Sequence, residues 1–331
     1  MSENTALRFS ENSGTPLSAS CPGKIFLLGE YAVLDQRPCL IAAIGPRFQM
    51  ERFPRTRTAA HSSSFHAESP AGLLLSVADL RAEWDFVFDE RIQGGGFGAS
   101  TAQFILLWTL TRIDTPANAH TDWNACWKTY RELTSRSALP PSGADLISQF
   151  KGGVHKIVLR DEGPDAEDLT SNFQGDQILI FSAAGIPGRK VATHEHLEKL
   201  ARSGFPKTSR ALLEDLESIT NEGIHALRES DQNTGDFARA LNSFADCLDT
   251  AGFEAASATE DRAWFSAQIG VRAAKGSGAL QADSLIVLLD ADLGRGTPLR
   301  SQLIEKARQR GLRLLCDGLT PEYGLSKGVL P

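Results

Sequence analysis

The stretch CPGKIFLLGEYAVL, residues 21–34, places polar side chains at both ends of an apolar run. Lys24 stands just before IFLL, a continuous apolar run that is typical of a buried β-strand. Glu30 and Tyr31 follow one glycine after the run. Charged groups are costly to bury unless they have a partner. The stretch therefore predicts a core strand whose two ends border a polar site.

The composition is that of an ordinary globular chain. The 331 residues suggest about two domains, with 41% hydrophobic and 23% charged residues. The net charge of −7 argues against nucleic acid or an acidic membrane as a partner. Five widely spaced cysteines without a CxxC pair indicate neither a disulfide framework nor a zinc site, and favour a cytoplasmic location. The sequence has neither an apolar signal-peptide core nor an apolar run of membrane-spanning length.

Periodicity predicts a mixed chain of strands and helices. Strand signals dominate residues 18–60, and further strands are expected at DFVFDERIQ, VHKIVLR, DQILIFSAAG, SLIVLLD and LRLLCD. Amphipathic or apolar patterns predict helices after the glycines at 94–98 and over 122–138, 193–230, 233–254 and 298–310. A domain boundary is expected in the polar region near 170–185. We therefore expect domains at 18–175 and 176–331.

The glycine segment, GGGFGAST at residues 94–101, leads into a helix. Glycines let the backbone approach a ligand closely, and the first amides of a helix attract anions. Hydroxyls at Ser100 and Thr101 could contact a phosphate or a magnesium ion. A flexible hairpin tip followed by a helix cap explains the glycines alone equally well.

Two other segments have ambiguous chemistry. Asp145, in PPSGADLISQFKGGV at 140–154, stands near an expected helix start. An aspartate there is often only a cap, worth about 1 kcal/mol, but it could also orient or deprotonate a substrate hydroxyl. Taken alone, the segment favours the cap. The third segment, KGSGALQAD at 275–283, is a small-residue loop that alone indicates a simple turn.

Together the segments resemble the motifs of the GHMP kinases, a superfamily that includes galactokinase, homoserine kinase, mevalonate kinase and phosphomevalonate kinase. PGKIFLLGEYAVL resembles the first motif, with Cys21 in place of the usual alanine before it. GGGFGASTA resembles GLGSSAA, and PSGAD resembles the PSGxD of mevalonate kinases. KGSGALQAD resembles KxSGAGGGD, although Leu280, Gln281 and Ala282 stand where the family has glycines. The resemblance runs from residue 21 to about residue 290.

This resemblance implies an α+β fold of two domains. The N-terminal sheet would contain a left-handed βαβ crossover, and the C-terminal domain would be ferredoxin-like. The implied activity is ATP-dependent phosphoryl transfer in the cytoplasm, with Mg²⁺, to a small molecule of the mevalonate pathway of isoprenoid precursors. Neither nucleic acid nor a membrane would be a partner, and the protein would be a monomer or homodimer.

The motif positions also imply site residues. Lys24 and Asp145 would be catalytic, with Lys24 stabilising the aspartate as an anion and offsetting charge on the transferred group. ATP would contact Gly94, Gly95, Gly96, Phe97, Gly98, Ala99, Ser100 and Thr101, and Ser100 would also bind the metal. The acceptor side would comprise Glu30, Tyr31, Ser142, Arg189, Lys190, Lys275, Ser277 and Gly278.

Some positions depart from the family pattern or leave the acceptor open. Mevalonate kinases carry a magnesium-binding glutamate where this chain has Thr134, and Glu132 is two residues away. GEYAVL and Asp283 favour phosphomevalonate as acceptor, whereas PSGAD favours mevalonate. The cations available for a phosphorylated acceptor are Arg47, Arg189, Lys190, His194 and His196. An alternative of another class is a non-catalytic protein that binds a nucleotide or a small acid.

Overall fold

The computed structural model describes most of the chain. The described residues are 16–55, 65–78, 84–89, 96–112, 122–136, 140–182, 193–206, 209–229 and 234–329. Four expected site residues, Gly94, Gly95, Arg189 and Lys190, lie outside these ranges, as does the side chain of His194. Among the described residues, no helix is both long enough and apolar enough to cross a membrane.

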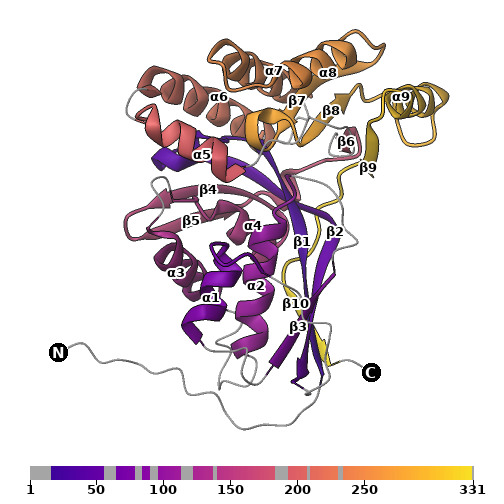
Figure 1. Ribbon diagram of the computed structural model, residues 1–331. Helices are drawn as coiled ribbons and strands as arrows, with labels where there is room; N and C mark the ends of the chain where they lie inside the picture. The colour runs from indigo at the N-terminus through magenta and orange to yellow at the C-terminus, as the bar shows by residue number, and fades with distance from the viewer. Residues whose placement is uncertain are drawn as a thin grey trace.

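The first sheet is antiparallel and has six strands (Figure 1). These are β1 (Leu17–Leu28), β2 (Cys39–Pro54), β3 (Trp84–Phe88), β4 (Val154–Arg160), β5 (Gly163–Asp168) and β10 (Ser326–Val329). The strand order is β10-β1-β2-β4-β5, and β3 pairs with the second half of β2. Because β10 pairs with β1, the chain returns to its first sheet after it has completed the second.

Four helices cover one side of the long β1–β2 pair (Figure 1). They are α1 (Pro70–Ala78), α2 (Ala99–Arg112), α3 (Trp123–Thr134) and α4 (Ala144–Lys151). Helix α2 is buried on almost every side, which explains why its sequence is apolar all round rather than amphipathic. Both α2 and α4 contact β1, the strand that carries Lys24.

The second sheet is also antiparallel and has the order β7-β8-β6-β9. Its strands are β6 (Ile178–Ser182), β7 (Val271–Ser277), β8 (Ser284–Leu289) and β9 (Arg313–Asp317). Its helices are α5 (Thr193–Arg202), α6 (Arg210–Arg228), α7 (Thr234–Thr250), α8 (Ala256–Ser266) and α9 (Pro298–Gln309). Helices α7 and α8 contact β7, and short 3₁₀ turns lie at Ala32–Asp35, Thr170–Asn172 and Ala279–Gln281.

The structure differs from the sequence-based expectation in several elements. The helix expected over 193–230 is divided into α5 and α6 near Pro206, because proline cannot continue a helix. Helices α1 and α8 and strands β5 and β10 were not expected. Strands β5 and β10 have polar sequences because each pairs on one side only, at an edge of the first sheet. The first three residues of the third segment belong to β7 rather than to a loop.

Candidate functional site

Lys24 connects β1 directly to the glycine segment. Its side chain is buried, and its amide donates a 3.1 Å hydrogen bond to the carbonyl of Phe97. A Cβ at Gly98 would lie 3.1 Å from Cγ of Lys24 and 2.9 Å from Oε1 of Gln149. Gly98 also has a φ of 81°, a conformation that favours glycine. Only a glycine therefore fits between the lysine stem and α4.

The glycine segment ends at the first turn of α2. The amide of Ala102 bonds to the carbonyl of Gly98 over 2.8 Å and closes this turn. The three preceding amides therefore have no partner within the helix. Ser100 is exposed at this end, whereas Thr101 is buried. The segment thus has both features expected of a phosphate site: a glycine-rich approach and an accessible helix start.

Asp145 lies in the first turn of α4, but it does not occupy the cap position. Gly143, with a φ of 76°, is the residue that caps this helix. Oδ2 of Asp145 accepts a 2.7 Å hydrogen bond from the Thr101 hydroxyl, and Oδ1 accepts one of 3.1 Å from the Leu146 amide. Ser142 serves the turn itself, because its hydroxyl accepts a 3.2 Å bond from the amide of Ala144. The sequence segment alone favoured Asp145 as the helix cap. The structure shows that Gly143, and not Asp145, takes the cap position.

The charges of Lys24 and Asp145 lie in the same region without forming an ion pair. The Lys24 ammonium stands 4.8 Å from the centre of the Phe26 ring, and among the described contacts none pairs it with Asp145. Burial raises the pKa of the Cys39 thiol. The charges of Glu30 and Asp145 raise this pKa further, and that of Lys24 lowers it. The stem of Lys24 lies against Gly98, and Asp145 bonds to Thr101, so both residues adjoin the start of α2.

Glu30 and Lys275 bind each other across the two sheets. Nζ of Lys275 lies 2.5 Å from Oε1 of Glu30 and 2.8 Å from the carbonyl of Gly276. Lys275 is fully buried, and this burial lowers its pKa, while Glu30 acts in the opposite direction. The other carboxylate oxygen of Glu30 has no hydrogen-bond partner among the described residues. From the sequence, both residues were expected on the acceptor side. In the structure they form an ion pair with each other.

Tyr31 connects β1 to two further elements. Its hydroxyl accepts a 3.1 Å hydrogen bond from the amide of Leu280 and lies 3.1 Å from Nε2 of His196 on α5. Burial, and to a smaller degree Lys199, lowers the pKa of His196 and favours its neutral form. The neutral ring can accept a hydrogen bond from the Tyr31 hydroxyl at Nε2. The same hydroxyl therefore bridges the third segment and α5.

Two non-glycine residues of the third segment have a glycine-like backbone. Leu280 and Gln281 have φ values of 49° and 58°, whereas Ala282 has an ordinary φ of −98°. Left-handed geometry costs a non-glycine residue about 1–2 kcal/mol. Gly278, with a φ of 95°, lies against the Asp283 side chain, which also contacts Gly96. The third segment and the glycine segment therefore touch through Asp283.

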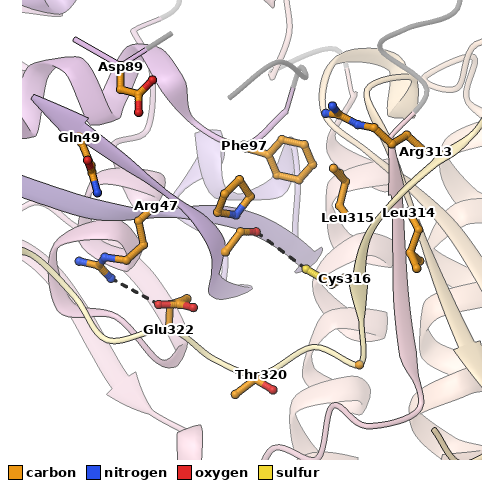
Figure 2. Close-up of a pocket in the computed structure, with 13 residues that line it drawn as sticks. Arg47, Gln49, Asp89, Phe97, Arg313, Leu314, Leu315, Cys316, Thr320 and Glu322 are labelled. Carbon is orange, nitrogen blue, oxygen red and sulfur yellow. Dashed lines mark hydrogen bonds and ion pairs between the residues drawn. The ribbon is translucent and has the colours of Figure 1, made fainter. Parts of the chain in front are cut away.

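Arg47 has a structural role away from this region. Arg47 lines a groove of about 850 Å³ between β2 and β9 (Figure 2), and among the described residues of the glycine segment only Phe97 also lines it. The Arg47 guanidinium stacks on the Tyr323 ring at 3.8 Å, bonds to the Tyr323 and Gly324 carbonyls, and lies 3.5 Å from the Glu322 carboxylate. Arg47 therefore fixes the segment that leads to β10.

The metal-binding alternative at Glu132 does not fit the helix. Helix α3 is continuous from Trp123 to Thr134, and two residues differ by about 200° around a helix. Glu132 is exposed, while Thr134 is buried and bonds to the Tyr130 carbonyl. Among the described residues, no three metal-ligating side chains of the His, Cys, Asp or Glu type gather. The exposed Ser100 hydroxyl fits Mg²⁺ bound mainly by nucleotide phosphates and water, which is this ion's usual mode.

Sequence reasoning missed Gln149 as a neighbour of the glycine segment. Its Nε2 donates a 2.8 Å hydrogen bond to the Pro22 carbonyl, and its Oε1 faces Gly98. The available signal was spacing: Gln149 follows Asp145 by one helical turn and so shares its face of α4. His196 was named only as an available cation, but its buried position beside Tyr31 favours the neutral form.

Comparisons with known proteins give the fold. Neither a family model nor a curated protein sequence matches the chain. The Lin0012 protein from Listeria innocua superposes with a TM-score of 0.72 at 14% identity, covering 95% of this chain and 99% of its own. Phosphomevalonate kinase from Streptococcus pneumoniae gives 0.68 at 14%, covering 93% and 99%. L. major mevalonate kinase in complex with R-mevalonate gives 0.67 at 12%, covering 97% and 99%.

These similarities extend over nearly the whole chain, and the expected resemblance is confirmed at the level of the fold. The streptococcal kinase also superposes in its complex with phosphomevalonate and AMPPNP, with a TM-score of 0.67 at 13% identity, covering 92% of this chain and 99% of its own. This chain has the mixed helix-and-sheet fold of the GHMP kinases.

Proposed function

We propose that this chain is an ATP-dependent kinase of the GHMP superfamily that phosphorylates a small acceptor of the mevalonate pathway. One observation carries the proposal: the 2.7 Å hydrogen bond between Thr101 and Asp145. It joins the expected phosphate site to the expected catalytic carboxylate, although the two lie on different helices. The likeness to phosphomevalonate and mevalonate kinases supports the same activity.

Each site residue has a role that its chemistry supports. The backbone around Gly98 and the start of α2 would bind the phosphates of ATP, and the Ser100 hydroxyl would contribute one ligand to Mg²⁺. When bound, the metal ion would neutralise part of the negative charge of the phosphates. Asp145 would orient the acceptor oxygen or accept its proton, and Lys24 would stabilise charge on the moving phosphoryl group. Phosphoryl transfer needs mainly such positioning and electrostatic stabilisation.

The preferred acceptor in this proposal is phosphomevalonate, with mevalonate as the alternative. A phosphorylated acceptor needs cations, and Lys275 and Arg47 already have anionic partners. Lys24, Arg189 and Lys190 are therefore the residues proposed to serve it. Replacing both Arg189 and Lys190 with alanine should raise the KM for phosphomevalonate more than the KM for ATP. An unchanged acceptor KM would remove this pair from the site.

A coupled ADP-release assay across mevalonate, phosphomevalonate, homoserine and galactose tests the proposal. We expect the highest kcat/KM with phosphomevalonate. A higher value with mevalonate would favour the alternative acceptor, and turnover of only homoserine or galactose would contradict the mevalonate-pathway assignment. No turnover of any acceptor, together with measurable ATP binding, would favour the non-catalytic binding protein.

We also propose the remaining domain details of the family fold. The division would fall between residues 175 and 176, with a left-handed βαβ crossover in the first domain. The second sheet has the order β7-β8-β6-β9, with α5–α8 between β6 and β7 and α9 between β8 and β9. This βαββαβ order supports a ferredoxin-like second domain.

A further inference from the structure

The turn that follows β1 holds the third segment through two successive residues. Glu30 pairs with Lys275 at the beginning of that segment, at 2.5 Å. Tyr31 accepts the hydrogen bond from the Leu280 amide near its middle, at 3.1 Å. Each contact joins side chains or backbone groups more than two hundred positions apart in the sequence. Both Glu30 and Tyr31 are buried, so these contacts are shielded from water.

The peptide groups around Leu280 are fixed from both sides. Its N–H binds the Tyr31 hydroxyl, and its carbonyl accepts a 2.9 Å hydrogen bond from the amide of Ala255. Leu280 is left-handed, with a φ of 49°, although it has a Cβ. Such a conformation persists at a non-glycine residue only where the surroundings determine it. Here the two hydrogen bonds are those surroundings.

The position of this loop affects the glycine segment. A Cβ at Gly96 would lie 2.8 Å from Cβ of Asp283, and one at Gly278 would lie 2.3 Å from Oδ2 of the same side chain. The third segment is therefore packed against the glycine segment with no spare room. If Leu280 relaxed to an ordinary φ, the chain leading to Asp283 would move, and this contact would change.

We infer that Glu30 and Tyr31 are positioning residues, which hold the third segment against the glycine segment and do not bind the acceptor. Glu30 anchors the start of the segment at Lys275, and the Tyr31 contact holds at Leu280 the left-handed backbone that glycine adopts without help. The inference rests on the proposed kinase function for its catalytic consequence. A positioning defect should lower kcat and leave the acceptor KM nearly unchanged, whereas loss of an acceptor ligand should raise that KM.

Tyr31→Phe tests this inference because it removes the hydroxyl and keeps the ring. We expect kcat to fall about tenfold, the effect of one hydrogen bond, while the acceptor KM changes by less than about twofold. In Leu280→Gly, position 280 adopts the left-handed backbone without help from Tyr31. Tyr31→Phe should therefore lower kcat less in this background than in the unmodified protein. The matched control is Tyr323→Phe, at a residue that is 64% exposed, and this variant should keep normal kinetics. A raised acceptor KM at normal kcat, or an equal kcat loss in both backgrounds, would overturn the inference.

Hydrogen exchange of the substrate-free protein gives a readout that needs no activity. Amides in the peptide covering residues 276–283 should exchange faster in Tyr31→Phe than in the unmodified protein or Tyr323→Phe. Unchanged exchange there would overturn the inference even if the kinase activity is found. Faster exchange in a protein that turns over no acceptor would support the restraint and count against the proposed function alone.

Discussion

The hydroxyl of Thr101 donates a 2.7 Å hydrogen bond to Oδ2 of Asp145 and so connects the first turns of α2 and α4. Thr101 is buried, which shields the bond from water. A hydrogen bond to an ionised carboxylate is stronger than one between neutral groups. The residue that completes the glycine segment therefore also fixes the orientation of the proposed catalytic carboxylate.

Replacing Thr101 with valine should damage turnover by releasing Asp145. We expect kcat to fall about ten- to a hundredfold, because a hydrogen bond to a charged group contributes about 1.5–3 kcal/mol. Steady-state kinetics check this result. The matched control is Thr109→Val on the same helix, where the buried hydroxyl bonds to the Ile105 carbonyl at 2.8 Å and to no other described residue. An equal kcat loss in both variants would indicate a general defect in α2 and not a role for Asp145.

Ser100→Ala should weaken the handling of magnesium and ATP more than acceptor binding. The Ser100 side chain is exposed at the start of α2, where an anion or its metal ion would bind. Separate titrations of ATP and acceptor, each at saturating partner, give the two KM values. Equal changes in both, or no change in either, would remove Ser100 from the nucleotide site.

Breaking the Glu30–Lys275 pair should destabilise the fold. Glu30→Gln leaves the buried ammonium of Lys275 without an anion, which should lower the free energy of unfolding by about 3–5 kcal/mol. Urea unfolding measures this loss. Adding Lys275→Met should recover at least half of it, since no unpaired charge then stays buried.

The surface pair of Arg210 and Glu214 provides the control, with side chains 83% and 54% exposed. Glu214→Gln should change the free energy of unfolding by less than about 0.5 kcal/mol. If Glu30→Gln had no larger effect than Glu214→Gln, the pair across the two sheets would not contribute to stability.

Stability should fall as the pH decreases through the range where His196 titrates. Burial lowers the pKa of this histidine from its ordinary value of 6.5, so the unfolded chain takes up the proton first. Its contribution is complete above pH 6.5 and is lost as the pH falls towards the folded-state pKa. Urea midpoints between about pH 7.5 and 5 should decline less steeply in His196→Gln. His155, whose pKa burial also lowers, stays in both proteins, so an unchanged slope would exclude a contribution from His196.

Local patterns were sufficient to predict the elements that carry the proposed chemistry. The apolar run after Lys24 is the last part of β1, although the strand begins at Leu17 and Lys24 therefore lies within it and not at its entrance. The apolar sequence after the glycines is α2, beginning at Ala99. Asp145 lies near a helix start, as expected. These features depend on residues close in sequence, whose propensities and spacing are visible without a structure.

The long-range contacts had no comparable signal. Glu30 and Lys275 are 245 positions apart, and nothing in either segment indicates their pairing. Leu280 is left-handed because Tyr31 and Ala255 bind its two peptide groups, which local propensity would not predict for a leucine. Asp145 was favoured as a cap because sequence does not reveal that Gly143 takes that position.

Lys24 and Asp145 should act as one catalytic unit. Lys24→Met and Asp145→Asn should each lower turnover strongly, and the double variant should be little worse than either single variant, as expected of residues that act together. Additive losses would indicate that the two side chains serve separate steps.

Turnover of Asp145→Asn, measured by ADP release with the best acceptor, tests the central claim most directly. Asparagine keeps the shape of the side chain and can still accept the Thr101 hydrogen bond, but it lacks the negative charge and cannot take up a proton at neutral pH. We predict a folded protein with a nearly unchanged unfolding midpoint and a turnover that is lower by at least about a hundredfold. Near-normal turnover in the folded variant would contradict a catalytic role for the Asp145 carboxylate.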